Sequence, residues 1–214
     1  MRRNGTFFIS IVAHKQLVPS IWDPYSYRKN GLGECLGDYV TTSEPTKPQD
    51  TAHISPFCPI EYRHIPKGKY LSFMLEFSQD NAKSTWPVVG EEQLLFGTLR
   101  AYIGNVLVTP RAEWLNLASP LFFPVKSEFV CLIPRDDLHY FWWAYLRSDS
   151  FRRHLPLGGG GTRPRLDKKA LMQTPVKVPD IDTRRSIHER LKNCAMREWK
   201  QYAEKLEILN SISL

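Results

Sequence analysis

The sequence predicts an α+β fold. We expect a globular domain over residues 1–180, with a mixed or antiparallel β-sheet and short helices, and then one long C-terminal helix over residues 181–214. Two observations lead to this prediction. Apolar stretches of strand length, bounded by Gly, Pro or Asn, fill the middle of the chain. Helical periodicity replaces them after residue 135. A hydrophobic content of 42% in 214 residues suffices for one packed core.

The strands are expected mainly in the middle of the chain. Prolines and other turn formers in residues 31–70 favour loops and short edge strands there, because proline cannot donate a ladder hydrogen bond. The apolar stretches with strand character are residues 7–12, 69–77, 92–109 and 118–134.

Two short helices are expected before the long one. Leu138, Phe141, Trp142, Tyr145 and Leu146 follow the i, i+3, i+4, i+7, i+8 spacing of one apolar helix face. Asp136 or Asp137 would cap this helix. Further on, Asp167 can cap a short helix over residues 168–173, and residues 174–179 are expected to form a strand that Pro179 closes.

The C-terminal segment is predicted to be one helix from Thr183 to about Leu209, capped by Asp182 or Thr183. At 1.5 Å per residue it would be roughly 40 Å long, which exceeds the needs of a small domain. Its apolar residues approximate a coiled-coil seam that favours a partner helix. A helix folded back on its own domain is the alternative. The seam consists of Leu191, Ala195, Trp199, Tyr202, Leu206 and Leu209.

A run of glycines lies beside strong positive charge in "LPLGGGGTRPRLDKKAL", residues 155–171. Glycine lets another molecule approach the main chain closely. No Lys-Ser or Lys-Thr pair follows, so this is not a Walker phosphate loop, and Pro164 argues against a dinucleotide loop. The remaining readings are a nucleic-acid loop and a flexible surface hinge. Basic residues outnumber aspartates seven to two in residues 147–169: Arg147, Arg152, Arg153, Arg163, Arg165, Lys168 and Lys169.

Catalysis by this chain is not indicated. The sequence contains no G-x-S-x-G elbow, no H-E-x-x-H and no clustered metal ligands, and we expect no cofactor. The four cysteines lie far apart, which favours free thiols in a reducing cytoplasm over a zinc site or disulfides. No run approaches the length of a membrane span. The net charge of +7 favours an anionic partner.

Several segments, in order, resemble the specificity subunits of type I restriction–modification systems. One strand segment carries Arg100 and Tyr102 before a Gly turn, and the helix that follows it ends in Leu-Arg-Ser. The most telling stretch, residues 158–191, joins glycines, Thr162 and basic residues to a short helix, a Pro-ended strand and a long helix. The similar segments are residues 21–28, 34–48, 92–110, 118–128, 140–155 and 158–191.

The resemblance implies a target recognition domain followed by the family's conserved helix. The chain would read double-stranded DNA as a non-enzymatic subunit, while partner subunits methylate and cleave; the methyltransferase subunit would be a direct partner in phage defence. The implied DNA-binding residues are Thr98, Arg100, Tyr102, Gly161, Thr162, Arg163 and Arg165.

The chain departs from the family pattern at the start of the long helix and in size. Asp180 follows Pro179 where the family has a second proline, and Arg184 stands where it has glutamine. A full specificity subunit has two recognition domains and two helices, whereas this chain has one of each. It therefore resembles either a half-subunit, which would form a homodimer through residues 183–209 and read a palindromic, bipartite site, or a naturally shortened relative of the family. A stand-alone DNA-binding protein and an interaction protein that does not bind DNA are the alternatives.

Overall fold

The computed structural model describes residues 34–44, 58–65, 68–77, 86–156 and 164–212. The expected strand at residues 7–12 lies outside these ranges. The helices are α1 (Leu36–Tyr39), α2 (His139–Arg147), α3 (Asp149–Arg152), α4 (Lys168–Met172) and α5 (Ile181–Ile212), with 3₁₀ turns η4 (Tyr62–His64), η6 (Ala101–Ile103) and η7 (Ala112–Leu115). The strands are β1 (Val40–Ser43), β2 (Val88–Val89), β3 (Leu94–Gly97), β4 (Val106–Val108), β5 (Phe123–Pro124) and β6 (Phe129–Pro134).

The predicted α+β class with an antiparallel sheet is confirmed. Four strands form a sheet in the order β1-β6-β3-β4, with every neighbouring pair antiparallel, and β2 pairs with β5 in a second, two-stranded sheet. The central strand β3 is buried along its whole length. The segments 92–109 and 118–134 supply four of these six strands, as their apolar pattern predicts.

Helix α2 packs between the sheet and α5, so it is buried on more than the one face that its periodicity indicates. Trp142 and Phe141 on the predicted face are buried, but so are Tyr140 and Trp143, which lie off it. The Trp143 indole donates a hydrogen bond to the Val106 carbonyl of β4 at 3.1 Å. This contact accounts for a tryptophan outside the predicted stripe.

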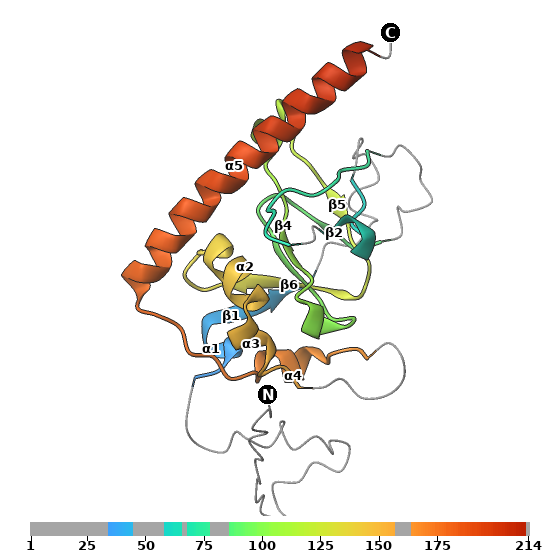
Figure 1. The fold of residues 1–214 in the computed structure, drawn as a ribbon. Helices are drawn as coiled ribbons and strands as arrows, with labels where there is room; N and C mark the ends of the chain where they lie inside the picture. The colour runs from blue at the N-terminus through green and yellow to red at the C-terminus, as the bar shows by residue number, and fades with distance from the viewer. Residues whose placement is uncertain (1–33, 45–57, 66–67, 78–85, 157–163, 213–214) are drawn as a thin grey trace, which may run out of the picture.

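Helix α5 lies along one side of the domain, and its C-terminal end extends beyond it (Figure 1). Trp199 is 1% exposed and meets the edge of Phe73 at 5.0 Å between ring centroids. The Glu198 carboxylate accepts hydrogen bonds from the backbone N–H groups of Leu71 and Ser72 at 2.8 and 2.9 Å. The Tyr202 hydroxyl accepts another from the Leu75 N–H at 3.0 Å.

These contacts explain why the strand predicted at residues 69–77 is wrong. Three of the segment's backbone N–H groups are bonded to side chains of α5 rather than to a neighbouring strand. The strand predicted at residues 174–179 is also wrong. That segment is irregular and makes only one bridge, from Pro175 to Cys35.

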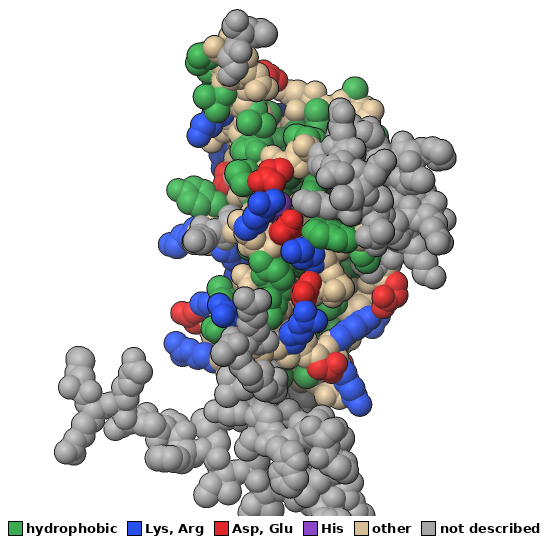
Figure 2. Space-filling model, turned by 90° about the vertical axis from the view of Figure 1, so that its right-hand side faces the viewer, with side chains coloured by type: hydrophobic (Ala, Val, Ile, Leu, Met, Phe, Trp, Pro, Cys, Tyr) green, Lys and Arg blue, Asp and Glu red, His purple; other side chains and the backbone are tan. Residues whose placement is uncertain are grey.

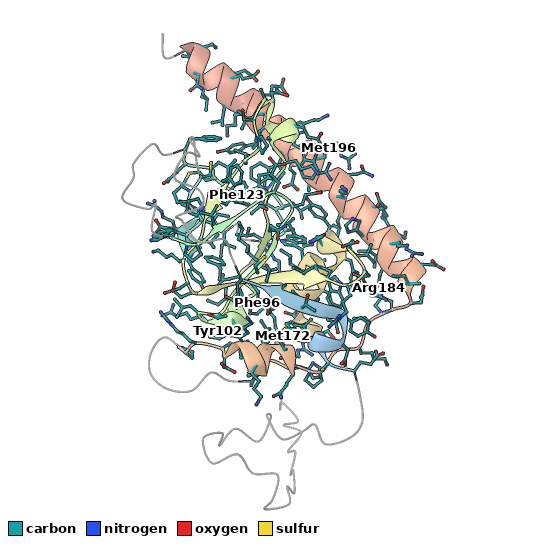
Figure 3. The ribbon with its side chains drawn as sticks, turned by 180° about the vertical axis from the view of Figure 1, so that it is seen from behind. Phe96, Tyr102, Phe123, Met172, Arg184 and Met196 are labelled. Carbon is teal, nitrogen blue, oxygen red and sulfur yellow. The ribbon has the colours of Figure 1, made fainter. Side chains whose placement is uncertain are left out.

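Arg184 connects the start of α5 to the domain. It is one of the positions at which the sequence departs from the family pattern. Its guanidinium forms an ion pair with Asp136 and lies 5.3 Å from the centre of the Tyr39 ring. Asp136 also accepts hydrogen bonds from the Leu138 N–H and the Trp142 indole, at 3.2 and 3.0 Å. Figure 3 shows Arg184 at the start of α5, close to the body of the domain.

The predicted helix caps are partly correct. Asp167 caps α4 by accepting a hydrogen bond from Ala170 N–H at 3.1 Å, as expected. For α5, Asp180 caps the helix in place of Asp182 or Thr183, because its carboxylate accepts from both the N–H and the hydroxyl of Thr183. For α2, the N-cap residue is Leu138 rather than an aspartate.

Candidate nucleic-acid interface

Two segments far apart in the sequence pair at the end of strand β3. The Arg100 N–H donates to the Pro164 carbonyl at 2.9 Å, and the Leu166 N–H donates to the Thr98 carbonyl at 3.0 Å. Leu99 and Arg165 form an antiparallel bridge between these bonds. We call residues 98–103 and 164–166 the recognition edge. It brings together four of the residues that the resemblance implies: Thr98, Arg100, Tyr102 and Arg165.

The inner side of the recognition edge is fixed by buried polar groups. The Thr98 hydroxyl donates to the Glu128 carbonyl at 2.8 Å, and the residue is 8% exposed. The Tyr62 hydroxyl accepts from the Leu99 N–H at 3.0 Å. A Cβ at Gly97 would lie 2.9 Å from that hydroxyl, so the residue before Thr98 must be small. Thr98 therefore holds the edge in place, and its contact with DNA stays a prediction.

The outer side of the recognition edge is the turn η6. Arg100 precedes it with φ of 50° and Gly104 follows it with φ of 78°, so both flanking residues adopt the left-handed conformation. Tyr102 and Ile103 are 52% and 50% exposed. Figure 3 shows Tyr102 at the same end of the domain as Met172 of α4, away from the C-terminal end of α5.

Basic side chains near the edge are paired with carboxylates. Arg165 lies 2.8 Å from Glu128, and its side chain is 63% exposed. Lys168 lies 2.9 Å from Glu44. Figure 2 shows Lys and Arg side chains interspersed with acidic ones over the lower part of the face it views. The Lys168–Glu44 pair is exposed at both ends, and exposed pairs are worth about 0–1 kcal/mol, whereas Glu128 is partly buried.

Two arginines of the basic segment, residues 147–169, make contacts within the domain. Arg147 lies 4.6 Å from the centre of the Trp143 ring and donates to the Gly68 carbonyl. Burial, with the nearby charge of Arg152, lowers the pKa of Arg147. Arg152 donates to the carbonyls of Tyr102 and Ile103 at 3.2 Å each. The surface positive charge at this end of the domain is therefore smaller than the sequence count suggests.

Gly161, Thr162 and Arg163 lie outside the described residues. Each is expected to contact DNA from the sequence, and that expectation stays a prediction. In the chain they directly precede Pro164, whose carbonyl accepts the hydrogen bond from Arg100.

The residues expected to pair two helices divide into two groups. Ala195 and Trp199 are 0% and 1% exposed, because they pack against the chain's own domain. Leu191, Tyr202 and Leu206 are partly buried. Leu209 is 49% exposed, with Ile208 and Ile212 beside it at 53% and 75%. The middle of α5 therefore packs on its own domain, as in the alternative of a helix folded back. The large apolar side chains of α5 that are exposed lie at its projecting C-terminal end.

Within the described ranges, no three His, Cys, Asp or Glu side chains come together to hold a metal ion. Across the same residues, no helix combines the length and apolar character that a membrane span requires. An open cavity of about 300 Å³ adjoins the recognition edge, lined in part by Thr98, Leu166, Glu44 and Lys168.

Three residues that shape the edge were not predicted from the sequence. Tyr62 accepts from the Leu99 N–H and Arg152 donates to the Tyr102 carbonyl, while the backbone carbonyl of Glu128 accepts from the Thr98 hydroxyl. In the sequence, Arg152 stands out only as one of several basic residues. Nothing local to these positions in a single sequence signals such contacts.

The fold and the recognition edge together define a class of protein. It is an antiparallel α+β domain in which two distant segments pair at one edge and a long helix packs along one side. This class includes a solved structure described as the HsdS subunit from Thermoanaerobacter tengcongensis, with a TM-score of 0.52 and 16% sequence identity. The alignment covers 83% of this chain and 45% of that one. The likeness confirms the fold that the sequence resemblance implies.

A second solved chain comes from a study titled "Structural basis underlying complex assembly and conformational transition of the type I R-M system". Its TM-score is 0.45 at 16% identity, over 81% of this chain and 41% of that one. This chain thus spans less than half the length of either. No protein-family model and no curated protein sequence matches it.

Proposed function

We propose that this chain is a sequence-specific DNA recognition subunit of a type I-like restriction–modification system, equivalent to half of a specificity subunit. The observation that carries the proposal is the recognition edge, where backbone pairing places Arg100, Tyr102 and Arg165 on one side of the domain. The likeness to an HsdS subunit supports it at the level of fold. The chain reads DNA and leaves methylation and cleavage to partner subunits.

Arginines at the edge suit both kinds of DNA contact. Arginine neutralises phosphates, which makes binding depend strongly on salt, and it reads guanine through two hydrogen bonds in the major groove. The Arg165 side chain is 63% exposed and is paired with one partly buried carboxylate, so its guanidinium remains accessible to a phosphate.

The proposal is tested in the full chain by reversing the charge of Arg165, in the recognition edge, together with that of Arg163, two residues earlier in the sequence. Arg163→Glu with Arg165→Glu should lower affinity for duplex oligonucleotides at low salt by more than about tenfold. It should reduce the slope of log affinity against log salt by about 1.8, since each phosphate contact contributes about 0.9.

The matched control is Arg197→Glu with Lys200→Glu, which makes the same change in net charge on exposed positions of α5. If both double variants bind duplex DNA equally well, DNA does not bind at the edge. If the wild-type chain shows no salt-dependent DNA binding at all, the interaction-protein alternative is correct.

The bipartite site of the proposed system requires a second recognition domain. We place the contact between two copies at the projecting end of α5, where Ile208, Leu209 and Ile212 are exposed. Such a homodimer reads a palindrome, because the two-fold symmetry of the protein is imposed on the site.

Mass in solution at micromolar concentration tests the homodimer. The wild-type chain should be a dimer, and Ile208→Glu with Ile212→Glu should be a folded monomer. A wild-type monomer that still binds duplex DNA tightly without a methyltransferase subunit would favour the stand-alone DNA-binding protein instead.

A further inference from the structure

We propose that Tyr102 and Ile103 form a rigid apolar tip that contacts the base or sugar faces of duplex DNA, and that Arg152 is the positioning residue for this tip. The proposal deepens the DNA-binding function above and rests on it. Three features of the structure carry it: the exposure of the tip, the backbone that presents it, and the hydrogen bonds that Arg152 makes.

The exposure of the tip is unusual for its residue types. Tyr102 and Ile103 are neighbours in the chain, and each leaves about half of its side chain in solvent. Single exposed apolar residues are common on protein surfaces, but adjacent large ones at a polar edge mark contact surfaces. Packing within the described part of the chain therefore does not account for them.

The backbone under the tip is held in a costly conformation. Arg100 has φ of 50°, a left-handed conformation that a residue with a side chain rarely adopts, and Gly104 closes the turn with φ of 78°. The Ile103 and Gly104 N–H groups bond back to the carbonyls of Arg100 and Ala101, both at 2.9 Å. Strain of this kind persists where the surroundings determine the conformation, and it concentrates at functional sites.

Arg152, at the end of helix α3, holds the turn in this conformation. One guanidinium nitrogen donates to the carbonyls of both tip residues, at 3.2 Å each, and another nitrogen forms an ion pair with Asp149. A Cβ at Gly104 would lie 3.1 Å from Arg152 Cδ, so the glycine permits this close approach. The planar guanidinium can hold Asp149 and two carbonyls together, whereas a lysine ammonium lacks that geometry. Arg152 is thereby committed to the turn.

The neighbourhood of the tip favours DNA as its partner. Arg165, on the adjoining strand segment, extends to the surface beside the turn, and the chain as a whole carries a net charge of +7. Proteins that read DNA combine phosphate contacts with apolar side chains that meet base faces or wedge between base steps. A turn fixed before binding loses little conformational freedom on contact, which raises affinity without new charge.

The positioning role can be tested without DNA. In Arg152→Met, hydrogen exchange at the Ile103 and Gly104 amides should accelerate by about tenfold or more. The turn opens locally because its carbonyls lose the guanidinium that donates to them. Arg153→Gln removes the same charge from the neighbouring, exposed position and should leave these amides unchanged. Equal exchange in wild type and Arg152→Met overturns the positioning role, whatever the DNA measurements show.

The DNA contact is tested with a duplex that the wild-type full chain selects from a random pool. Tyr102→Ala with Ile103→Ser should reduce the ratio of specific to non-specific affinity by about tenfold, the order expected when a stacked base loses its aromatic partner, with the salt slope unchanged. Arg152→Met should cause a similar loss in the wild-type background and no further loss in the double variant.

Additive losses, or a reduced salt slope in Arg152→Met, would mean that Arg152 binds phosphate directly, and would overturn the proposal. If the charge-reversal variant at Arg163 and Arg165 loses binding but the tip variants do not, the proposed function stands and the tip inference fails. If the wild-type chain binds no duplex, both the function and the tip contact are refuted.

Discussion

Replacing Trp199 by alanine tests whether the middle of α5 belongs to its own domain or to a helix pair. The side chain is 1% exposed and packs edge-on against Phe73 at 5.0 Å between centroids. Deleting a buried tryptophan costs about 3–5 kcal/mol. For a chain of this size each kcal/mol lowers Tm by about 2–4 °C, so we expect a decrease of about 6–20 °C.

The assay is thermal unfolding at two protein concentrations that differ about fiftyfold. Packing within one chain predicts the same decrease at both concentrations, because no association is involved. Leu209→Ala is the control, since that side chain is 49% exposed and should change stability by well under 1 kcal/mol at low protein concentration. A Trp199→Ala variant with unchanged monomer stability, or one whose loss disappears on dilution, would refute the intramolecular packing.

Two further predictions concern the same helix. Glu198→Gln should destabilise the chain by about 1–3 kcal/mol and speed amide exchange at Leu71 and Ser72, because the charged acceptor of both N–H groups is lost; unchanged exchange at both amides would contradict this. Burial lowers the pKa of His188 below its ordinary 6.5, and its Nδ1 accepts from the Tyr140 N–H. The unfolded chain therefore takes up a proton below about pH 6.5 that the folded chain does not, so stability is full above that pH and decreases as pH falls. His188→Gln should flatten this decrease in urea unfolding between pH 7 and 5, and an unaltered profile would exclude His188 as its source.

The elements that the sequence predicts well are those whose pattern is local. The strands of the segments 92–109 and 118–134 and the long helix carry their own periodicity and their own turn residues. Asp167 likewise caps α4 within its own turn. In each case the residues that determine the structure lie within a few positions of it.

The failures share a different cause. Residues 69–77 have strand composition, yet their N–H groups are bonded to Glu198 and Tyr202, more than 120 residues away. The periodicity of α2 indicates one buried face, but a helix with the sheet on one side and α5 on another buries Trp143 as well. No local pattern encodes contacts made at such separation.

The residues of the candidate site also fall into two groups, those that the sequence indicates and those that it does not. Arg100, Tyr102 and Arg165 were identified through the resemblance, and the structure places them on one edge. The groups that hold that edge, Tyr62 and Arg152, act on backbone atoms of other segments. These contacts join residues 37 and 50 positions apart, so no local sequence pattern marks them.

The pairing between residues 98–100 and 164–166 uses backbone N–H and carbonyl groups alone. Its geometry is therefore indifferent to which side chains occupy the outward positions. Exposed residues such as Tyr102 can be exchanged over evolutionary time while the scaffold beneath them keeps its shape. Substitutions at the exposed positions would therefore change the surface that this edge presents and leave the backbone pairing beneath it in place.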